Sequence, residues 1–247
     1  MITMKERFED GEFFILSDGT PLYYQQLGQG HPLLMLHGNG GSHHYFRGQI
    51  AALAQHFRLI LVDCRARGAS GNHKHALTFA MMVEDMRELL DFLGIAELSI
   101  LGFSDGANIA LLFAHRYPKR IKKLVLNAPN TRFYGTRFSN QYHAYLKVGL
   151  AFCQRWLSES HYQRYLISRL LLANLPLGKK DLQALNRPCL LIVGQKDMIK
   201  KSHSQRLAAS LPNCQFIEVP AARHTFAKTK PELFNQLLVP FLLDQQT

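Results

Sequence analysis

Residues 98–116 read LSILGFSDGANIALLFAHR, an apolar run followed by a glycine-flanked serine and then by a segment of helical length. The pattern G-x-S-x-G at residues 102–106 is typical of a sharp turn between a strand and a helix, which exposes the hydroxyl of Ser104 above the sheet. The flanking glycines leave room for neighbouring backbone. The helix that follows directs its first N–H groups at the same point, where they favour developing negative charge. This stretch therefore predicts a nucleophilic serine on an α/β fold.

Short apolar runs rich in Val, Ile and Leu lie on both sides of this turn. Two of them, at residues 12–16 and 21–27, predict an opening antiparallel hairpin around Asp18 and Gly19. The others are continuously apolar, as is typical of parallel strands covered by helices on both faces. They lie at residues 32–38, 57–64, 98–104, 122–129, 188–194 and 214–220. Helix-length spacers separate them, so we expect a mostly parallel sheet between two helical layers.

No strand pattern occurs between Pro129 and Pro188, a stretch of nearly sixty residues. Apolar side chains recur there at helical spacing, and we expect an all-helical lid over the sheet. The predicted organisation is a core of residues 1–130 and 186–247, interrupted by a lid at 131–185. Cys153 is expected to be packed, because it lies on one apolar helical face. That face is formed by Tyr145, Leu146, Gly149, Leu150, Cys153, Trp156 and Leu157.

A serine hydroxyl is a weak nucleophile, so it needs a base that is itself oriented by an acid. Asp197 follows the strand LLIVG and His224 follows the strand FIEVP, in the chain order Ser, Asp, His. The alternative is that Asp197 caps a helix beginning near Ser202 and that His224 is an ordinary loop residue. Because three independent placements agree, we expect Ser104, Asp197 and His224 to be the catalytic residues.

A glycine-rich turn, HGNGG, occupies residues 37–41 after the strand PLLML. Acyl transfer requires preorganised N–H donors for an oxyanion. This turn can bring the backbone N–H of Asn39 near Ser104, with that of Asp105 as the second donor. His37 would then brace the turn rather than take part in the chemistry. A phosphate-binding loop is excluded because no G-K-[ST] ending follows.

The chain also contains VDCRARGAS at residues 62–70, VGQKD at 193–197 and ARH at 222–224. With these motifs and those described above, it resembles the α/β-hydrolase-fold serine hydrolases, in a lid-bearing, carboxylesterase-like form. The resemblance covers nearly the whole length. It implies an eight-stranded, mostly parallel sheet whose second strand is antiparallel, and a lid inserted after strand six. It also implies that Asp63 and Arg65 fix a turn beside the site.

The predicted function is a cofactor-independent serine hydrolase that cleaves a small or medium carboxylic ester through an acyl-enzyme intermediate. The same fold also accommodates a peptidase or amidase, a lactonase, a carbon–carbon bond hydrolase or an acyltransferase. Dehalogenase and epoxide hydrolase chemistry is disfavoured, because those relatives carry Asp where this chain has Ser104. The alternative from another class is a slow-turnover ligand-binding receptor, because fold alone does not decide function.

The residue after the nucleophile has two interpretations. The form G-[FW]-S-D-G resembles the turn of α-amino-acid ester hydrolases related to valacyclovirase, in which this acid can meet the substrate ammonium. The alternative is that Asp105 begins the following helix and complements its dipole. We favour the second interpretation, because a basic lid would repel a cationic substrate.

The charge composition bears on whether the protein binds anionic partners such as nucleic acid. The 247 residues carry 29 Lys and Arg against 18 Asp and Glu, a net charge of +11. Residues 131–187 contribute nine basic and two acidic residues, or +7, which can attract anionic substrates or surfaces. No nucleic-acid motif accompanies this charge, so no nucleic-acid partner is expected.

Cysteine and histidine usage predicts neither a disulfide framework nor a metal site. The four cysteines lie far apart, and the pair His73 and His75 lacks the further ligands of a metal pattern. No apolar run reaches the roughly 18 residues of a membrane helix, and the polar amino terminus is unlike a secretory signal. We therefore expect a cytoplasmic enzyme acting on a small-molecule acyl substrate.

Overall fold

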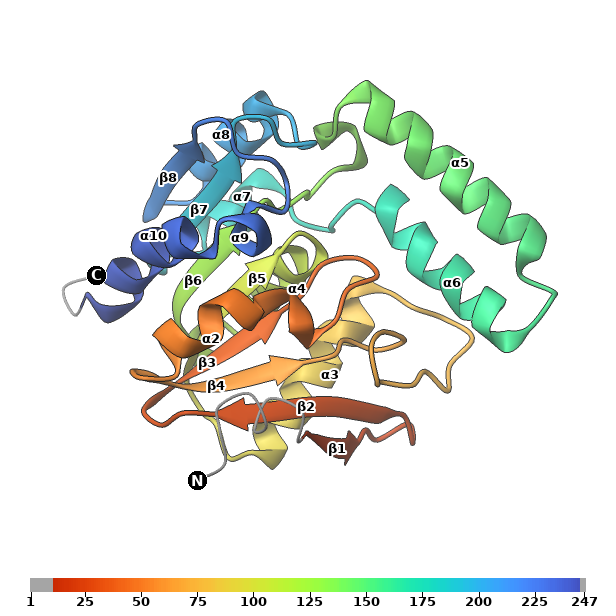
Figure 1. Cartoon of the computed structure of the whole chain (residues 1–247), viewed down its shortest axis with the longest axis horizontal. Coiled ribbons are helices and arrows are strands. Elements are labelled where there is room, and N and C mark those ends of the chain that lie inside the picture. The colour runs from red at the N-terminus through yellow and green to blue at the C-terminus, as the bar shows by residue number, and fades with distance from the viewer. Residues whose placement is uncertain (1–10, 245–247) are drawn as a thin grey trace.

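The computed structural model describes residues 11–244 (Figure 1), so the amino terminus discussed above lies outside the described residues. Eight strands form one sheet in the order β1-β2-β4-β3-β5-β6-β7-β8. β2 pairs antiparallel with β1 and with β4, and all other neighbouring strands are parallel. The predicted mostly parallel sheet of eight strands is confirmed. The strands are β1 Glu12–Ile15, β2 Pro21–Leu27, β3 His31–Leu36, β4 Phe57–Val62, β5 Leu98–Phe103, β6 Ile121–Asn127, β7 Cys189–Gly194 and β8 Cys214–Val219.

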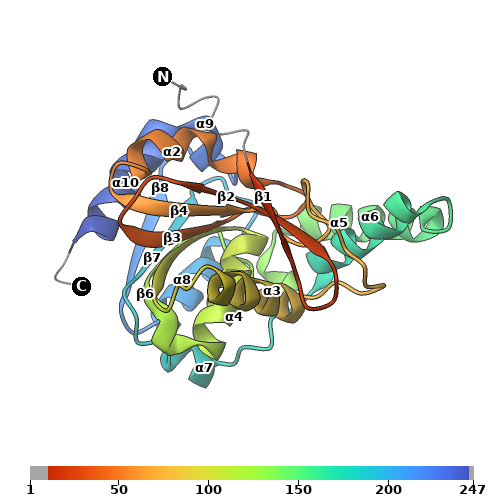
Figure 2. The same cartoon turned by 90° about the horizontal axis from the view of Figure 1, so that it is seen from below.

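Helices cover both faces of the sheet (Figure 2) because the central strands bury apolar side chains on both sides. Along β3, Leu34 and Leu36 belong to one core, whereas Leu33 and Met35 belong to the other. The first core is closed by α3 Phe79–Phe92, α4 Asp105–Arg116, α7 Lys179–Gln183 and α8 Lys201–Ser210. The second is closed by α2 Arg47–Leu53, α9 Phe226–Thr229 and α10 Pro231–Leu243.

α3 occupies the helix-length spacer between β4 and β5. Its first turn is capped by the Thr78 hydroxyl, which accepts a hydrogen bond from the Met81 N–H. Gly94 follows its end with a φ of 65°, a left-handed conformation that glycine adopts without strain. The buried stripe that includes Met82, Met86 and Leu89 packs α3 into the first core.

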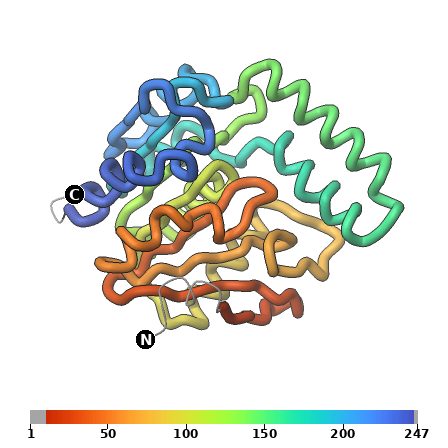
Figure 3. The backbone as a smooth tube through the Cα atoms, in the orientation of Figure 1, coloured from red at the N-terminus to blue at the C-terminus, as the bar shows by residue number. Residues whose placement is uncertain are grey.

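The chain between β6 and β7 is helical. We call residues 128–188 the insertion; it contains the 3₁₀ turn η3 Phe133–Gly135, α5 Phe138–Gln154, α6 Glu159–Arg169, the short turn η4 Leu170–Leu172 and α7. Leu166 and Leu170 pack into the first core and fix α6 to the sheet layer. α5 runs beside α6, and the pair projects from the body of the fold in both Figure 1 and Figure 2. The tube in Figure 3 shows the turn between them as the outermost corner of the insertion.

The prediction that Cys153 is packed is wrong, because its side chain is exposed on α5. The reason is that helical spacing identifies an apolar face but not whether another element covers it. In this structure α5 contacts α6 along a different side. Among the described residues, no helix has both the length and the apolar character that crossing a membrane requires.

Candidate active site

Ser104 lies at the predicted turn between β5 and α4. Its φ of 53° and ψ of −115° place it in a region that residues other than glycine rarely adopt. The backbone can follow this path because its neighbours carry no side chain. A Cβ on Gly106 would lie 1.9 Å from the Leu36 carbonyl oxygen, and one on Gly102 would lie 2.5 Å from the Gly106 carbonyl oxygen. Both positions therefore require glycine.

The structure brings Ser104, Asp197 and His224 together from the ends of β5, β7 and β8. Asp197 Oδ1 lies 2.8 Å from His224 Nδ1, and His224 Nε2 lies 3.2 Å from Ser104 Oγ. An ionised carboxylate only accepts hydrogen bonds, so a neutral imidazole bound to it carries its proton on Nδ1 and presents the Nε2 lone pair to the serine hydroxyl. A neutral histidine in this tautomer can take the proton of an attacking serine.

The alternative in which Asp197 caps the next helix is wrong. The residue at the cap position of α8 is Lys200. The Asp197 carboxylate instead accepts hydrogen bonds from His224 and, at 2.9 Å, from the Ile199 N–H. Only 2% of Asp197 is exposed, so this carboxylate is shielded from water while it holds the imidazole.

The glycine-rich turn after β3 passes directly beside Ser104. A Cβ added to Gly38 would lie 3.1 Å from Ser104 Cβ. Within residues 11–244, the backbone N–H groups of Asn39 and Asp105 have no hydrogen-bond acceptor. The N–H of Asp105 also begins α4, where the helix dipole adds positive potential. Two such donors beside a serine hydroxyl can stabilise an oxyanion.

The side chain of Asn39 connects three parts of the molecule. Its Nδ2 donates one hydrogen bond to Asp105 Oδ2 at 2.9 Å and another to the Ile167 carbonyl oxygen at 3.0 Å. Asp105 belongs to α4, and Ile167 belongs to α6 of the insertion. The turn that carries the Asn39 N–H is therefore tied both to the serine turn and to the insertion.

A buried arginine lies opposite the carboxylate of Asp105 and balances its negative charge. Arg67, whose side chain is only 1% exposed, places its guanidinium 3.4 Å from Asp105 Oδ2. Burial raises the pKa of Asp105, and the Arg67 charge opposes that rise. Asp63 and Arg65 of this turn were predicted from the sequence, whereas the role of Arg67 was not; the available signal was the second arginine of the R-A-R pattern beside the site.

Asp105 is consequently engaged by the protein itself. One of its oxygens accepts from Asn39 and faces Arg67. Arg137, Lys196 and Arg223 line a cavity of about 360 Å³ next to His224, and none of them has a carboxylate partner in the described part of the chain. This cationic approach would repel a substrate ammonium, as the sequence analysis argued from the basic insertion.

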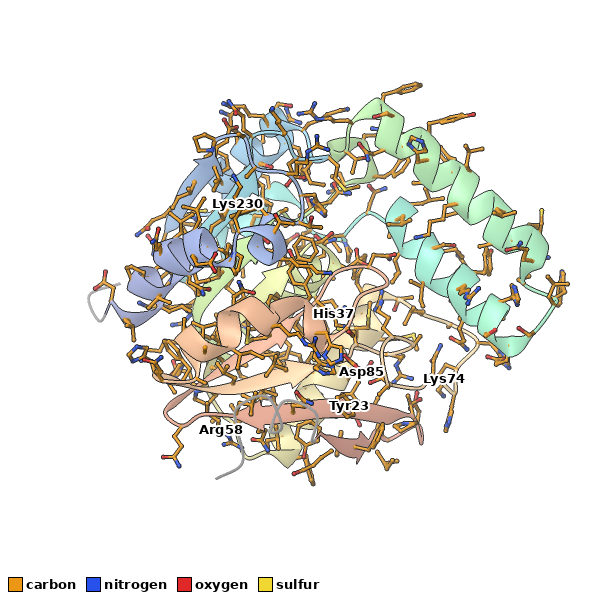
Figure 4. The ribbon with its side chains drawn as sticks, viewed as in Figure 1. Tyr23, His37, Arg58, Lys74, Asp85 and Lys230 are labelled. Atoms are coloured by element: carbon orange, nitrogen blue, oxygen red, sulfur yellow. The ribbon has the colours of Figure 1, made fainter. Side chains whose placement is uncertain are left out.

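His37 braces the glycine-rich turn, as predicted. Its Nδ1 donates to the Gly38 carbonyl at 2.8 Å, and its Nε2 accepts from the Cys64 N–H at 3.0 Å. Complete burial, and secondarily the charge of Arg67, lower the pKa of His37 to about 4, so the ring is neutral at pH 7. Figure 4 shows His37 inside the fold, whereas Arg58 and Lys74 project away from it.

The turn at residues 63–70 has the structural role that the resemblance implied. Asp63 Oδ1 accepts from the backbone N–H and Nδ1 of His43, at 2.7 and 2.8 Å, and its Oδ2 accepts from the Ala69 N–H. Arg65 binds Asp85 through two nitrogens, at 2.8 and 2.6 Å. In the described residues, no group of three or more His, Cys, Asp or Glu side chains is arranged to hold a metal ion.

Comparisons with known proteins agree with this architecture. The family model of the alpha/beta hydrolase fold matches residues 31–151. A protein of Caulobacter sp. (strain K31) named "Putative carbamate hydrolase RutD" is 30% identical over 238 residues, which cover 83% of this chain and 88% of that protein.

Two solved structures share the fold over nearly their whole length. A thermophilic esterase from Thermogutta terrifontis has a TM-score of 0.81 at 22% identity, over 94% of this chain and 98% of that chain. The enol-lactonase from Burkholderia xenovorans LB400 has a TM-score of 0.78 at 20% identity, over 94% of this chain and 100% of that chain. At this level of identity the likeness concerns the fold and leaves the substrate open.

Proposed function

Because the chain belongs to the α/β-hydrolase-fold superfamily and is a hydrolase, we propose that it is a serine hydrolase that cleaves small or medium carboxylic esters. One observation carries the proposal. His224 lies between Asp197 Oδ1 and Ser104 Oγ, with Nδ1 2.8 Å from the first and Nε2 3.2 Å from the second. This arrangement supports Ser104 as nucleophile, His224 as base and Asp197 as the acid that orients it.

The proposed reaction has two half-reactions. Ser104 Oγ attacks the ester carbonyl carbon while its proton passes to His224 Nε2. The tetrahedral intermediate collapses, the carbon–oxygen bond breaks, and the alcohol leaves with the proton held by His224. A water molecule then attacks the acyl-enzyme as His224 takes its proton. The carboxylic acid leaves, and the proton returns to Ser104.

The oxyanion of both intermediates is assigned to two backbone donors. The N–H groups of Asn39 and Asp105 support this role because they lie beside Ser104 and have no acceptor within residues 11–244. Each such donor is worth about 10²–10³ in rate in other acyl-transfer enzymes. The Asp105 carboxylate does not contact substrate in this proposal, because Asn39 and Arg67 engage it.

The insertion is assigned the role of a lid. Residues 131–185 would cover the site formed by the core, residues 1–130 and 186–247. The hydrogen bond from Asn39 to the Ile167 carbonyl supports this role, because it joins the lid helix α6 to the proposed oxyanion turn. A lid in this place can exclude water from the acyl-enzyme and select the substrate.

Carbamate hydrolysis is the second candidate, favoured by the name of the Caulobacter relative that is 30% identical over most of both chains. A carbamate carbonyl presents the same electrophilic carbon to Ser104. The chemistry differs at the leaving group, because expulsion of an amine requires His224 to protonate nitrogen. The same residues therefore serve both candidates.

Steady-state rates on p-nitrophenyl esters of increasing acyl length, and on an N-(4-nitrophenyl) carbamate that releases 4-nitroaniline, separate the candidates. We expect sustained turnover of the short and medium esters, and the loss of that turnover in Ser104→Ala. Ser139→Ala, at an exposed position of α5, is the matched control and should retain it. Sustained carbamate turnover with ester turnover at the level of Ser104→Ala would overturn the ester proposal in favour of the second candidate.

A further inference from the structure

The outer side of α5 exposes a continuous row of large apolar side chains. Phe138 is 81% exposed and Leu150 is 61% exposed, and the exposed residues recur at helical spacing. The row ends at the turn between α5 and α6, where Trp156 is 77% exposed. We define the α5 outer face as Phe138, Tyr142, Leu146, Leu150, Trp156 and Leu157.

No part of the described chain covers this face. A Cβ built on Gly149, which lies among these residues, would have no heavy atom within 4 Å. α5 and α6 project from the body of the fold in two perpendicular views (Figures 1 and 2). Contiguous apolar surface of this kind marks a docking surface, because leaving it in water is unfavourable.

The charge around the face is positive. α5 contains no Asp or Glu, and Glu159, at the start of α6, is the acidic residue next to the α5–α6 turn. Arg155 stacks its guanidinium over the rings of Phe152, at 3.4 Å, and Trp156, at 4.5 Å. Arg137 and Arg164 are exposed at the start of α5 and on α6. An aromatic and aliphatic face bordered by cations is typical of a helix that lies in the plane of a lipid surface.

We propose that the α5 outer face and the α5–α6 turn dock onto an anionic phospholipid bilayer. Apolar side chains enter the boundary between headgroups and acyl chains, with Trp156 at the headgroup level, where indole rings are favoured. Arg155 then meets the lipid phosphates, because basic residues near such a surface are attracted to it. Docking does not depend on the proposed ester chemistry, since no catalytic group takes part.

A second copy of the chain is the less favourable occupant. In a two-fold symmetric contact the same patch meets itself, so Arg155 would approach its own copy. Residues 131–187 carry +7, and burying like charges against one another costs free energy. An anionic bilayer neutralises the same charges.

Trp156 provides the test, because it is the only tryptophan of the 247 residues and lies on the proposed face. Its emission should shift to shorter wavelength when phosphatidylglycerol vesicles are added, and should not shift with phosphatidylcholine vesicles. About 1 M salt should weaken the interaction, because it shortens the Debye length to roughly 3 Å. No shift with phosphatidylglycerol would overturn the proposal.

Introducing a negative charge into the apolar row gives the matched comparison. Leu146→Glu and Leu150→Glu should each weaken vesicle affinity about tenfold or more, because each removes a buried apolar side chain and places a negative charge at an anionic surface. Ile15→Glu, at a residue that is 59% exposed on β1, should leave vesicle affinity unchanged. If sedimentation instead shows a dimer that Leu146→Glu dissociates, the face belongs to a second copy and the lipid proposal is wrong.

Discussion

Asn39, in the turn after β3, donates a hydrogen bond of 3.0 Å to the backbone carbonyl of Ile167 in α6. The same amide holds Asp105 Oδ2 at 2.9 Å. The backbone N–H of Asn39 is one of the two donors proposed for the oxyanion. The position of that donor is therefore linked to the position of the insertion, and a displacement of α6 would also displace the turn.

Asn39→Ala tests this link, since alanine keeps the backbone N–H and removes both side-chain hydrogen bonds. We expect kcat on a short ester to fall about tenfold, because small misplacements of catalytic groups are costly. KM should change less, since the side chain is not proposed to contact the substrate. Asn186→Ala, which breaks a surface pair with Asn213, is the control. An unchanged kcat in Asn39→Ala would show that the tether does not position the donor.

Asp105→Asn keeps the backbone donor and removes the charge opposite Arg67. Breaking a buried ion pair leaves an uncompensated charge, so the free energy of unfolding should fall by about 3–5 kcal/mol in urea titrations. Turnover of a simple acetate ester and of an amino-acyl ester should fall by the same factor. A selective loss on the amino-acyl ester would instead assign the Asp105 carboxylate to recognition of the substrate ammonium.

Asp197→Asn and Asp63→Asn distinguish the catalytic acid from a structural one. Asp197→Asn should lower kcat/KM by about 10⁴ with little change in unfolding, because the imidazole would adopt the wrong tautomer. Asp63→Asn should chiefly lower the free energy of unfolding, by about 1–3 kcal/mol, because Asp63 accepts hydrogen bonds from His43 and Ala69. A larger activity loss from Asp63→Asn, with stability unchanged, would move the acid to the end of β4.

The sequence was sufficient for features that depend on local pattern. The strand expected at residues 57–64 is present as Phe57–Val62, because a continuously apolar run has few other ways to bury itself. The turn at Ser104 was predictable because Gly102 and Gly106 meet backbone from their immediate neighbours and from β3.

Two side-chain contacts between distant segments were not predictable. The contact of Asn39 with Ile167 depends on the angle at which α6 packs against the sheet, and no local pattern encodes that angle. The approach of Arg67 to Asp105 depends likewise on the path of a loop. Cys153 was misplaced because the spacing of apolar residues identifies a helical face but not what covers it.

His37 gives the protein a defined response to acid. Its pKa is about 4 in the folded chain against a usual 6.5, so the unfolded chain binds more protons between these pH values. The contribution of His37 to the free energy of unfolding should be complete above about pH 6.5. It should be lost as the pH drops toward 4, which lowers the free energy of unfolding by about 3 kcal/mol. His203, whose pKa is also lowered to about 4, adds to the same slope.

Urea unfolding of His37→Asn across this pH range measures the contribution. The variant should show a shallower dependence of unfolding free energy on pH than the parent, whatever its stability at pH 7. His143→Asn, at an exposed position of α5, should keep the parental slope. An identical slope in His37→Asn would mean that His37 is not the group that titrates.

The assignment of Ser104 as nucleophile is tested most directly by intact-mass spectrometry after labelling with a fluorophosphonate. The parent protein should gain one phosphonyl group, located on Ser104 by peptide mapping, and Ser104→Ala should gain none while unfolding at the same urea concentration. Ser42→Ala, beside the buried His43–Asp63 pair, should be labelled as the parent is. Labelling of Ser104→Ala at the parental level, or an adduct on another residue, would contradict the proposed mechanism.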